Sequence, residues 1–323
     1  MRRAGGRSMI TVPAPAGPGA FVHPALFYQD LAEYVAGVAG FVRTALSADE
    51  PVLVAVPGPH LDALRGSLGA DASEVVWTDM TDAGRNPGRI LAALQDFADH
   101  HPDRAARIVG EPIWPGRTPA EVREATRHEA LINAAFEGRR ATVLCPYDVR
   151  GLSAAVVADA RRTHPTVIEK GRDLPSAAYT DVAAVSADCD VPLPAPDGDV
   201  LRLDYAHGEL SAVRQQAENW ARGSALTPAR RGDLVLAVSE AAANSLSHGG
   251  GAGTLRLWAA EAGVVAEIQD GGHLADPLAG RRRPELASAN GGRGLWMIHQ
   301  LCDLVEIRAT DRGLTLRLHM ATL

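Results

Sequence analysis

The 323-residue sequence is poor in lysine, in cysteine and in long apolar runs. Lys170 is the only lysine, although arginine is abundant. A P-loop NTPase needs a lysine directly after its glycines to reach the β and γ phosphates, so that type of ATP site is excluded. The cysteines Cys145, Cys189 and Cys302 are odd in number and far apart, which is typical of reduced thiols in the cytoplasm.

Other absences limit the partners. No apolar run reaches the roughly 18 residues that a membrane span needs, and the early arginines are not followed by the apolar core and cleavage site of a signal peptide. The net charge is −7, and no basic cluster is interleaved with aromatic residues. Neither nucleic acid nor a membrane is therefore expected as a partner, and a cytoplasmic protein is expected. With 46% hydrophobic and 22% charged residues, the chain has an ordinary globular composition and is long enough for two domains.

The N-terminal part alternates between expected helices and strands. Apolar residues recur at helical spacing from Pro24 to about Leu46, and the β-branched run Val52–Val56 ends at a Pro-Gly-Pro turn. The expected order continues with helix 60–68, strand 74–77, helix 88–100, strand 106–109, helix 119–136, strand 141–145 and helix 152–163. Strands separated by helices pair in parallel, so residues 20–170 are predicted to form a three-layer α/β domain.

Residues 171–199 hold four prolines and show no sustained periodicity, which predicts a semi-extended linker. A third segment, 200–323, again alternates strands and helices. In it, Thr227-Pro228 indicates the N-cap and first-turn proline of a long helix. The expected order is strand 200–205, helix 209–222, the long helix, strands 253–260 and 264–269, helix 294–304, and strands 305–309 and 314–320. This pattern predicts a mixed sheet with helices on one face, so the whole chain is of the α/β plus α+β class.

Three short blocks in this last segment carry chemistry. Glu240, Asn244 and His248 stand at i, i+4 and i+8, so one helix face presents all three. Asp270 ends an expected strand and precedes two glycines, and residues 291–294 form a glycine loop that opens a helix. An acid and an amide one turn apart can handle a proton and Mg²⁺, and a helix N-terminus can bind phosphates.

In this order and spacing, the blocks resemble the N, G1 and G2 boxes of the GHKL ATPase superfamily, which includes histidine kinases and anti-sigma-factor serine kinases. The resemblance implies a two-layer α/β sandwich of the Bergerat type over residues 200–323, with ATP and Mg²⁺ as cofactors. It implies Asn244 as the Mg²⁺ ligand and Glu240 as the catalytic group that polarises the attacking hydroxyl or water. The ATP-binding residues that it implies are Asn244, His248, Asp270, Gly272, Gly292, Arg293, Gly294 and Thr315.

Each of these assignments has a plain structural alternative. Asp270 followed by glycine is also a strong turn signal, Glu240 is a potential surface charge, and Asn244 is a potential cap.

By the resemblance, Asp270 accepts from the adenine amino group and Thr315 assists it. The lid segment 273–290 is short, and neither an F box nor a phosphoacceptor helix is evident, which points to the anti-sigma-factor serine-kinase branch.

The N-terminal part carries a second resemblance. Six motifs look like the MEDS sensory domain of bacterial and archaeal signalling proteins: His23-Pro24, Tyr28, residues 111–114, Glu129 with Asn133, residues 145–148 and His164-Pro165. This likeness implies a fold related to RecA with a degraded phosphate loop, and a small organic molecule as the sensed ligand. The candidate ligand contacts are His23, Tyr28, Trp114, Cys145, Tyr147 and His164.

These sensor candidates also have simpler explanations. His23 and His164 precede proline, which often ends a helix, and a cysteine at a strand end such as Cys145 is more often a small buried hydrophobe. No CxxC or HxxxH spacing is present, so a metal site of these three residues is not favoured. His128 is followed by an acid, as in histidine-kinase phosphoacceptors. Its helix lies within the α/β domain, however, and residues 165–205 cannot form a two-helix stalk.

Together these observations predict a cytoplasmic signalling protein in which a small-molecule sensor regulates an ATP-binding serine/threonine kinase of the anti-sigma-factor type. The expected partners are an anti-sigma antagonist of the STAS type, a sigma factor, or both, and a homodimer is compatible with the sequence. Two alternatives stay open. One is an ATP-dependent binding module without phosphotransfer, and the other is a histidine-kinase-like protein that acts on a separate phosphoacceptor.

Overall fold

The computed structural model describes residues 20–284 and 293–322, which form two compact units. The first unit comprises the chain up to Gly84 together with Ala93–Val185, and the second comprises Arg85–Ala92 together with the chain from Ser186. Each unit has its own sheet. Among the described helices, none combines the length and the apolarity needed to cross a membrane.

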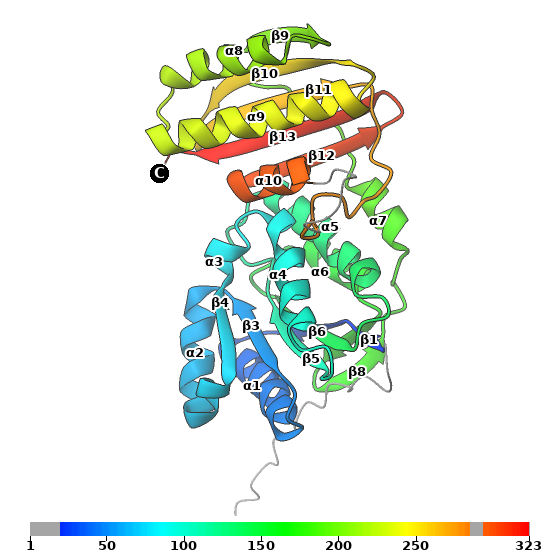
Figure 1. Cartoon of the computed structure of the whole chain (residues 1–323). Coiled ribbons are helices and arrows are strands. Elements are labelled where there is room, and N and C mark those ends of the chain that lie inside the picture. Colours follow the sequence, from blue (N-terminus) through cyan, green and yellow to red (C-terminus); the bar gives the residue numbers. More distant parts are fainter. Residues whose placement is uncertain (1–19, 285–292, 323) are drawn as a thin grey trace, which may run out of the picture. The chain divides into compact units, whose positions relative to one another are not determined.

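The sheet of the first unit has eight strands (Figure 1). Its order is β4 (Val75–Asp79), β3 (Val52–Val56), β5 (Ala106–Gly110), β6 (Ala141–Asp148), β2 (Pro24–Tyr28), β7 (Thr166–Glu169) and β8 (Arg172–Pro175). The short β1 (Phe21–Val22) also pairs with β6. All neighbours are parallel except β7 and β8, so the predicted parallel sheet is confirmed.

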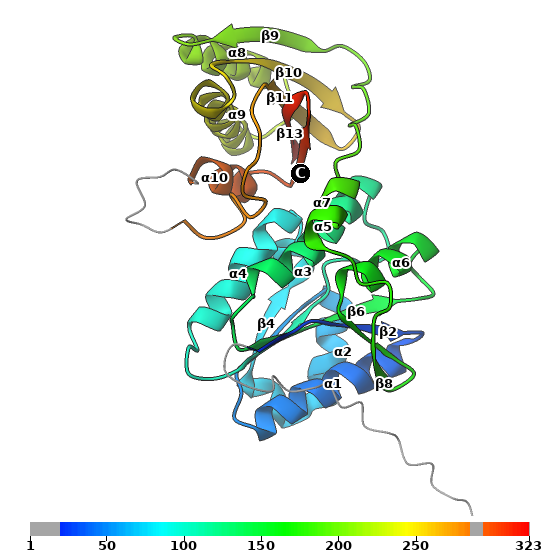
Figure 2. The same cartoon turned by 90° about the vertical axis from the view of Figure 1, so that its right-hand side faces the viewer.

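Helices cover both faces of this sheet, which gives the predicted three layers. Helices α1 (Leu31–Ser47) and α2 (Gly58–Leu68) pack together on one face, and α5 (Pro119–Ala135) and α6 (Ala154–Thr163) pack together on the other (Figure 2). A capping box starts α5, because Thr118 and Glu121 bond each other's backbone N–H groups. Between α2 and β5 the chain also forms the helical elements η1 (Gly69–Glu74), α3 (Met80–Ala83) and α4 (Pro87–Asp99).

The first helix of the chain begins later than the sequence predicted. The stretch Pro24–Tyr28, expected to begin a helix, is strand β2, which lies between β6 and β7 with all five residues buried. A strand buried on both faces is a continuous apolar run, which periodicity cannot distinguish from a helix. The helix begins only at Leu31, where the Asp30 side chain accepts from the Glu33 N–H at 2.8 Å.

The segment 171–199 is not the irregular linker that was predicted throughout its length. It contains β8 and the helix α7 (Val182–Asp188), and the boundary between the two units falls inside α7. Lys170 and Gly171 both have positive φ, 51° and 72°, and they form the tight turn that lets β8 pair antiparallel with β7. Such short elements give no periodic signal, which is why the sequence did not reveal them.

The second unit is a two-layer α/β sandwich, as predicted. Its sheet has the order β12 (Leu304–Thr310), β13 (Gly313–Ala321), β11 (Gly263–Asp270), β10 (Ala252–Ala260) and β9 (Leu201–Ala206). Every pair is antiparallel, so the expected mixed sheet was wrong in that respect. The helices are α8 (Leu210–Arg222), α9 (Pro228–His248) and α10 (Arg293–Leu301), and α9 packs on the sheet through a core that includes Leu234, Val238, Leu255 and Leu318.

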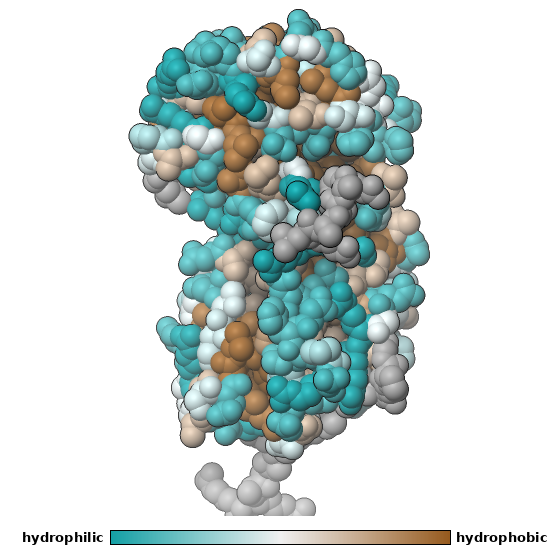
Figure 3. Space-filling view, in the orientation of Figure 1, coloured by the Kyte–Doolittle hydropathy of each residue, from teal (hydrophilic) through white to brown (hydrophobic). Residues whose placement is uncertain are grey.

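Apolar side chains also reach the surface of this unit. On the face in view in Figure 3 they gather over the region where Figure 1 shows α8 and α9. Val235 and Leu236 of α9 line a groove there, together with Arg214 and Arg222 of α8.

Candidate functional site

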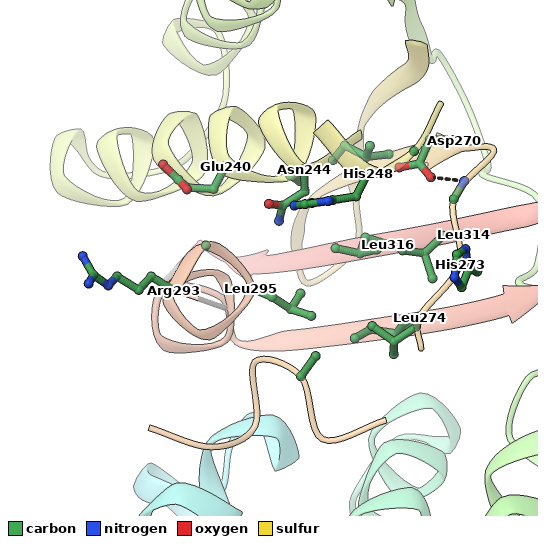
Figure 4. Close-up of a pocket in the computed structure, with 17 residues that line it drawn as sticks. Glu240, Asn244, His248, Asp270, His273, Leu274, Arg293, Leu295, Leu314 and Leu316 are labelled. Carbon is green, nitrogen blue, oxygen red and sulfur yellow. Dashed lines mark hydrogen bonds between the residues drawn. The ribbon is translucent and has the colours of Figure 1, made fainter. Parts of the chain in front are cut away.

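A pocket of ≈ 530 Å³ opens in the second unit beside α9 (Figure 4). Its lining combines a polar helix face, which carries a carboxylate, an amide and an imidazole, with an apolar wall. The residues concerned are Glu240, Ala241, Asn244, His248, Gly249, Ile268, Asp270, Gly272, His273, Leu274, Ala279, Arg293, Gly294, Leu295, Ile307, Leu314 and Leu316. Six of the eight residues predicted to bind ATP therefore line one cavity.

Helix α9 presents Glu240, Asn244 and His248 to the pocket on one face, as their spacing predicted. The first turn of α10 approaches the same face. A Cβ added to Gly294 would lie 3.0 Å from Glu240 Oε2 and 3.4 Å from the side-chain oxygen and nitrogen of Asn244, so the backbone of α10 comes close to both side chains here. The first turn of a helix has N–H groups without helical partners and attracts anions. This end of the pocket suits phosphate and its metal ion.

Asp270 lies at the opposite end of the pocket from Glu240 (Figure 4). Ser245 Oγ donates to its Oδ2 at 2.5 Å, and the Gly272 N–H donates to its Oδ1 at 2.8 Å. A Cβ on Gly249 would lie 2.4 Å from Asp270 Cγ, so only glycine leaves this carboxylate in place. Ser245 and Gly249 were not predicted as site residues. The signal was their position in the same block, next to Asn244 and His248.

Thr315 does not lie where the resemblance implied. Residues Leu314 and Leu316 on either side of it line the pocket. Successive side chains of a strand point to opposite faces, so Thr315 points away from the pocket, and its pairing partner on β11 is Gln269. Ser245, rather than Thr315, holds Asp270. Gly292 and part of the expected lid, 285–290, lie outside the described residues.

The wall between these two ends is apolar. It is formed by Ile268, Leu274, Leu295, Leu314 and Leu316. A slot of branched aliphatic side chains accepts a flat ring, and an ionised carboxylate at its edge accepts hydrogen bonds but donates none. The pocket therefore fits a ring that carries an amino group, with an anionic, metal-bound part near Gly294. The residues present fit Mg·ATP.

The six sensor candidates of the first unit fall in three places. His23, Cys145 and His164 come together in the interior with Glu129. Tyr147 is next to them, with its ring centroid 5.6 Å from that of His164. Trp114 lies apart, under the guanidinium of Arg117 at 3.8 Å from the ring centroid.

Tyr28 belongs to another polar cluster, centred on the buried Glu111. The Tyr34 hydroxyl donates to Glu111 at 3.1 Å, the Tyr28 hydroxyl at 3.4 Å, and His60 Nδ1 lies 2.8 Å from the same carboxylate. Burial raises the pKa of Glu111. Burial acts to lower the pKa of His60, but the hydrogen bond and the charge of Glu111 outweigh it, so the His60 pKa is raised.

This second cluster is placed where a ligand could reach it. Tyr28 ends β2, Glu111 directly follows β5, and His60 is on the first turn of α2 after β3. Ligands of parallel sheets bind at the carboxyl ends of the strands. The His60 side chain is 22% exposed, whereas that of Glu111 is 1% exposed, so the cluster connects the interior to the surface. Of this group the sequence-based candidates included only Tyr28.

The antiparallel two-layer sandwich holds a pocket that fits a nucleotide. Comparison with known families agrees. Residues 204–320 match the histidine kinase-like ATPase domain, and residues 22–165 match MEDS, the methanogen/methylotroph, DcmR sensory domain. The chain thus consists of a MEDS sensory domain followed by a histidine kinase-like ATPase domain, as both resemblances predicted. A search of curated proteins finds no match to the chain.

Proposed function

We propose that this protein is a signalling serine/threonine kinase of the anti-sigma-factor type, controlled by a small molecule that its MEDS domain senses. One observation carries the proposal. Glu240 and Asn244 lie beside Gly294 at one end of the pocket, and Asp270 lies at the edge of an apolar slot at the other. This arrangement suits a nucleotide whose base and phosphates are held at opposite ends.

In this proposal the chain's residues hold ATP and Mg²⁺ as follows. Asp270 accepts from the amino group of adenine, and Leu274, Leu314 and Leu316 enclose the ring. Asn244 offers its side-chain oxygen to Mg²⁺, a hard cation that takes few protein ligands. The backbone at Gly294 faces the phosphates.

Glu240 has the position of a group that orients the attacking hydroxyl. It reaches the first turn of α10 beside Asn244, which places a carboxylate next to the phosphate end of the pocket. Phosphoryl transfer needs positioning and charge stabilisation more than covalent help. Glu240→Gln should therefore keep ATP bound and slow phosphotransfer by about a hundredfold or more. The matched control is Glu218→Gln on α8, outside this pocket, where the ion pair with Arg222 is exposed.

A hydroxyl acceptor on a partner is favoured over an internal histidine. His128, the residue whose sequence context resembles a phosphoacceptor, is 1% exposed within α5 of the first unit. A buried imidazole cannot enter another domain's active site. The proposed partner is an anti-sigma antagonist of the STAS type, a sigma factor, or both, which rests on the short lid and the missing F box in the sequence.

The deciding experiment incubates the full chain, with its co-purified proteins, with Mg²⁺ and ATP radiolabelled on the γ-phosphate. Label on a partner that is stable to acid and labile to alkali supports the serine/threonine kinase. Acid-labile label would instead support a histidine-kinase-like protein with a separate phosphoacceptor. Tight ATP binding without any transfer, equal in wild type and Glu240→Gln, would support a nucleotide-dependent binding module and refute the kinase.

A further inference from the structure

Four side chains that bind transition metals meet in the interior of the MEDS domain. His23 precedes β2, Glu129 is on α5, Cys145 is on β6, and His164 caps the end of α6. Each offers one ligand atom, and these atoms all lie within 4.8 Å of one another. The four residues are between 0% and 2% exposed, so solvent does not satisfy their polar atoms.

Three of the distances between these atoms are close to the edges of a tetrahedron around zinc. His23 Nε2 and His164 Nε2 lie 3.1 Å and 3.2 Å from Glu129 Oε2, and Cys145 Sγ lies 3.4 Å from His23 Nε2. Zinc bonds of about 2.0 Å to nitrogen and oxygen and about 2.3 Å to sulfur put tetrahedral neighbours about 3.3 to 3.6 Å apart. These three distances differ from tetrahedral edges by only a few tenths of an ångström, and all six distances among the four ligand atoms are within 4.8 Å.

The hydrogen bonds behind His23 fix which of its ring nitrogens faces the cluster. Its Nδ1 lies 3.1 Å from Asn133 Oδ1. The amide nitrogen of Asn133 donates to the Thr163 carbonyl at 2.8 Å, so its oxygen is the atom that faces His23. Because that oxygen can only accept, Nδ1 carries the hydrogen, and Nε2 of the neutral ring presents a lone pair to Glu129 and Cys145.

His164 is oriented in the same way. Its Nδ1 lies 2.8 Å from the Ala160 carbonyl oxygen, which can only accept, so Nε2 again presents a lone pair. Both imidazole lone pairs therefore face a carboxylate oxygen. The second oxygen, Glu129 Oε1, has no hydrogen-bond partner among the described residues. Electron pairs that face one another in a buried space need a proton or a metal ion between them, and histidine ligands of metals typically donate their other N–H to an oxygen in this manner.

We propose that His23, Glu129, Cys145 and His164 bind one Zn²⁺ ion in the MEDS domain. Two imidazoles, one thiolate and one carboxylate form a donor set that suits zinc, whereas Mg²⁺ and Ca²⁺ take oxygen ligands. Four protein ligands fill a tetrahedral shell, so this zinc is a structural ion. It fastens the central strands β2 and β6 to α5 and α6. The site is independent of the nucleotide pocket, so its failure would leave the proposed kinase function intact.

The first test measures metal in the full chain, purified without chelator, by mass spectrometry; about one zinc per chain is expected. Protein reconstituted with Co²⁺ should show the intense visible bands of a tetrahedral site and a thiolate-to-cobalt charge-transfer band in the near ultraviolet. Cys145→Ser should lose the charge-transfer band. Cys189→Ser, which changes another buried cysteine outside the cluster, should keep it.

A second measurement covers the case in which Cys145→Ser does not fold. Adding a strong chelator to the wild-type protein should lower its thermal midpoint, and adding back zinc should restore it, because a ligand bound only by the folded state stabilises that state. Wild-type protein that takes up neither zinc nor cobalt above background, and whose midpoint ignores the chelator, would overturn the proposal. A charge-transfer band that survives in folded Cys145→Ser, or iron as the bound metal, would overturn the assignment.

Discussion

Replacing Asp270 by asparagine is the sharpest test of the nucleotide pocket, because the change keeps the shape of the side chain. The asparagine oxygen can accept from the Gly272 N–H, which now lies 2.8 Å from Oδ1. Its nitrogen then faces Ser245 Oγ in place of Oδ2. The Ser245 hydroxyl can turn to accept from it, and that oxygen already lies 3.3 Å from the Ala241 carbonyl, a second place to donate. The fold should therefore tolerate the substitution.

The cost for ATP can be worked out from the hydrogen bond that is lost. A carboxylate accepts from the amino group of adenine, whereas an amide nitrogen at the same place has a hydrogen that opposes it. A hydrogen bond to a charged group contributes about 1.5–3 kcal/mol, and about 1.4 kcal/mol corresponds to a factor of ten. Asp270→Asn should weaken ATP binding by about tenfold to about a hundredfold.

Inosine triphosphate makes the test specific, since its ring has an oxygen where adenine has the amino group. Wild-type protein should bind ATP more tightly than inosine triphosphate, and Asp270→Asn should abolish or reverse this preference. Calorimetric titration of both nucleotides in the presence of Mg²⁺ measures the ratio of the two Kd values. Asp311→Asn, in the exposed turn between β12 and β13, is the control. An unchanged ratio in folded Asp270→Asn would refute the role of Asp270 in reading the base.

Three further outcomes are expected. Asn244→Ala should abolish most of the Mg²⁺-dependent part of ATP affinity in calorimetry, whereas the control Asn219→Ala, on the exposed side of α8, should not. If Asn244→Ala binds Mg·ATP with the same affinity as the wild type, Asn244 has no metal role. The pKa of His60 is raised above 6.5 by Glu111, so the folded state holds the proton more tightly than the unfolded state. The free energy of unfolding should therefore fall as the pH rises from 6.5 through the raised pKa. His60→Gln should lack this pH dependence in denaturant titrations. Leu234→Ala, at a fully buried position on α9, should cost about 2–5 kcal/mol in the free energy of unfolding of the ATPase domain, and a loss below about 1 kcal/mol would contradict its place in the core.

Local signals predicted the ATPase domain well. The spacing of Glu240, Asn244 and His248 places them on one side of any α-helix, so the sequence alone brought them together. Asp270 ends a strand as predicted, with Gly272 close to it. Thr315 was misplaced because the face of a strand depends on the register of β13 against β11, and a shift of one residue reverses it.

The MEDS domain shows what only the tertiary structure decides. Its alternation of helices and strands was visible in the sequence, because each element has its own periodicity. The cluster of His23, Glu129, Cys145 and His164 was not, since its members come from four elements, and His23 is 106 residues from Glu129 and 122 from Cys145. Metal-ligand spacing such as CxxC arises when one turn supplies neighbouring ligands. Here the parallel pairing of β2 with β6, the packing of α5 with α6, and the contacts of His23 with Glu129 and Asn133 on α5 supply the proximity instead.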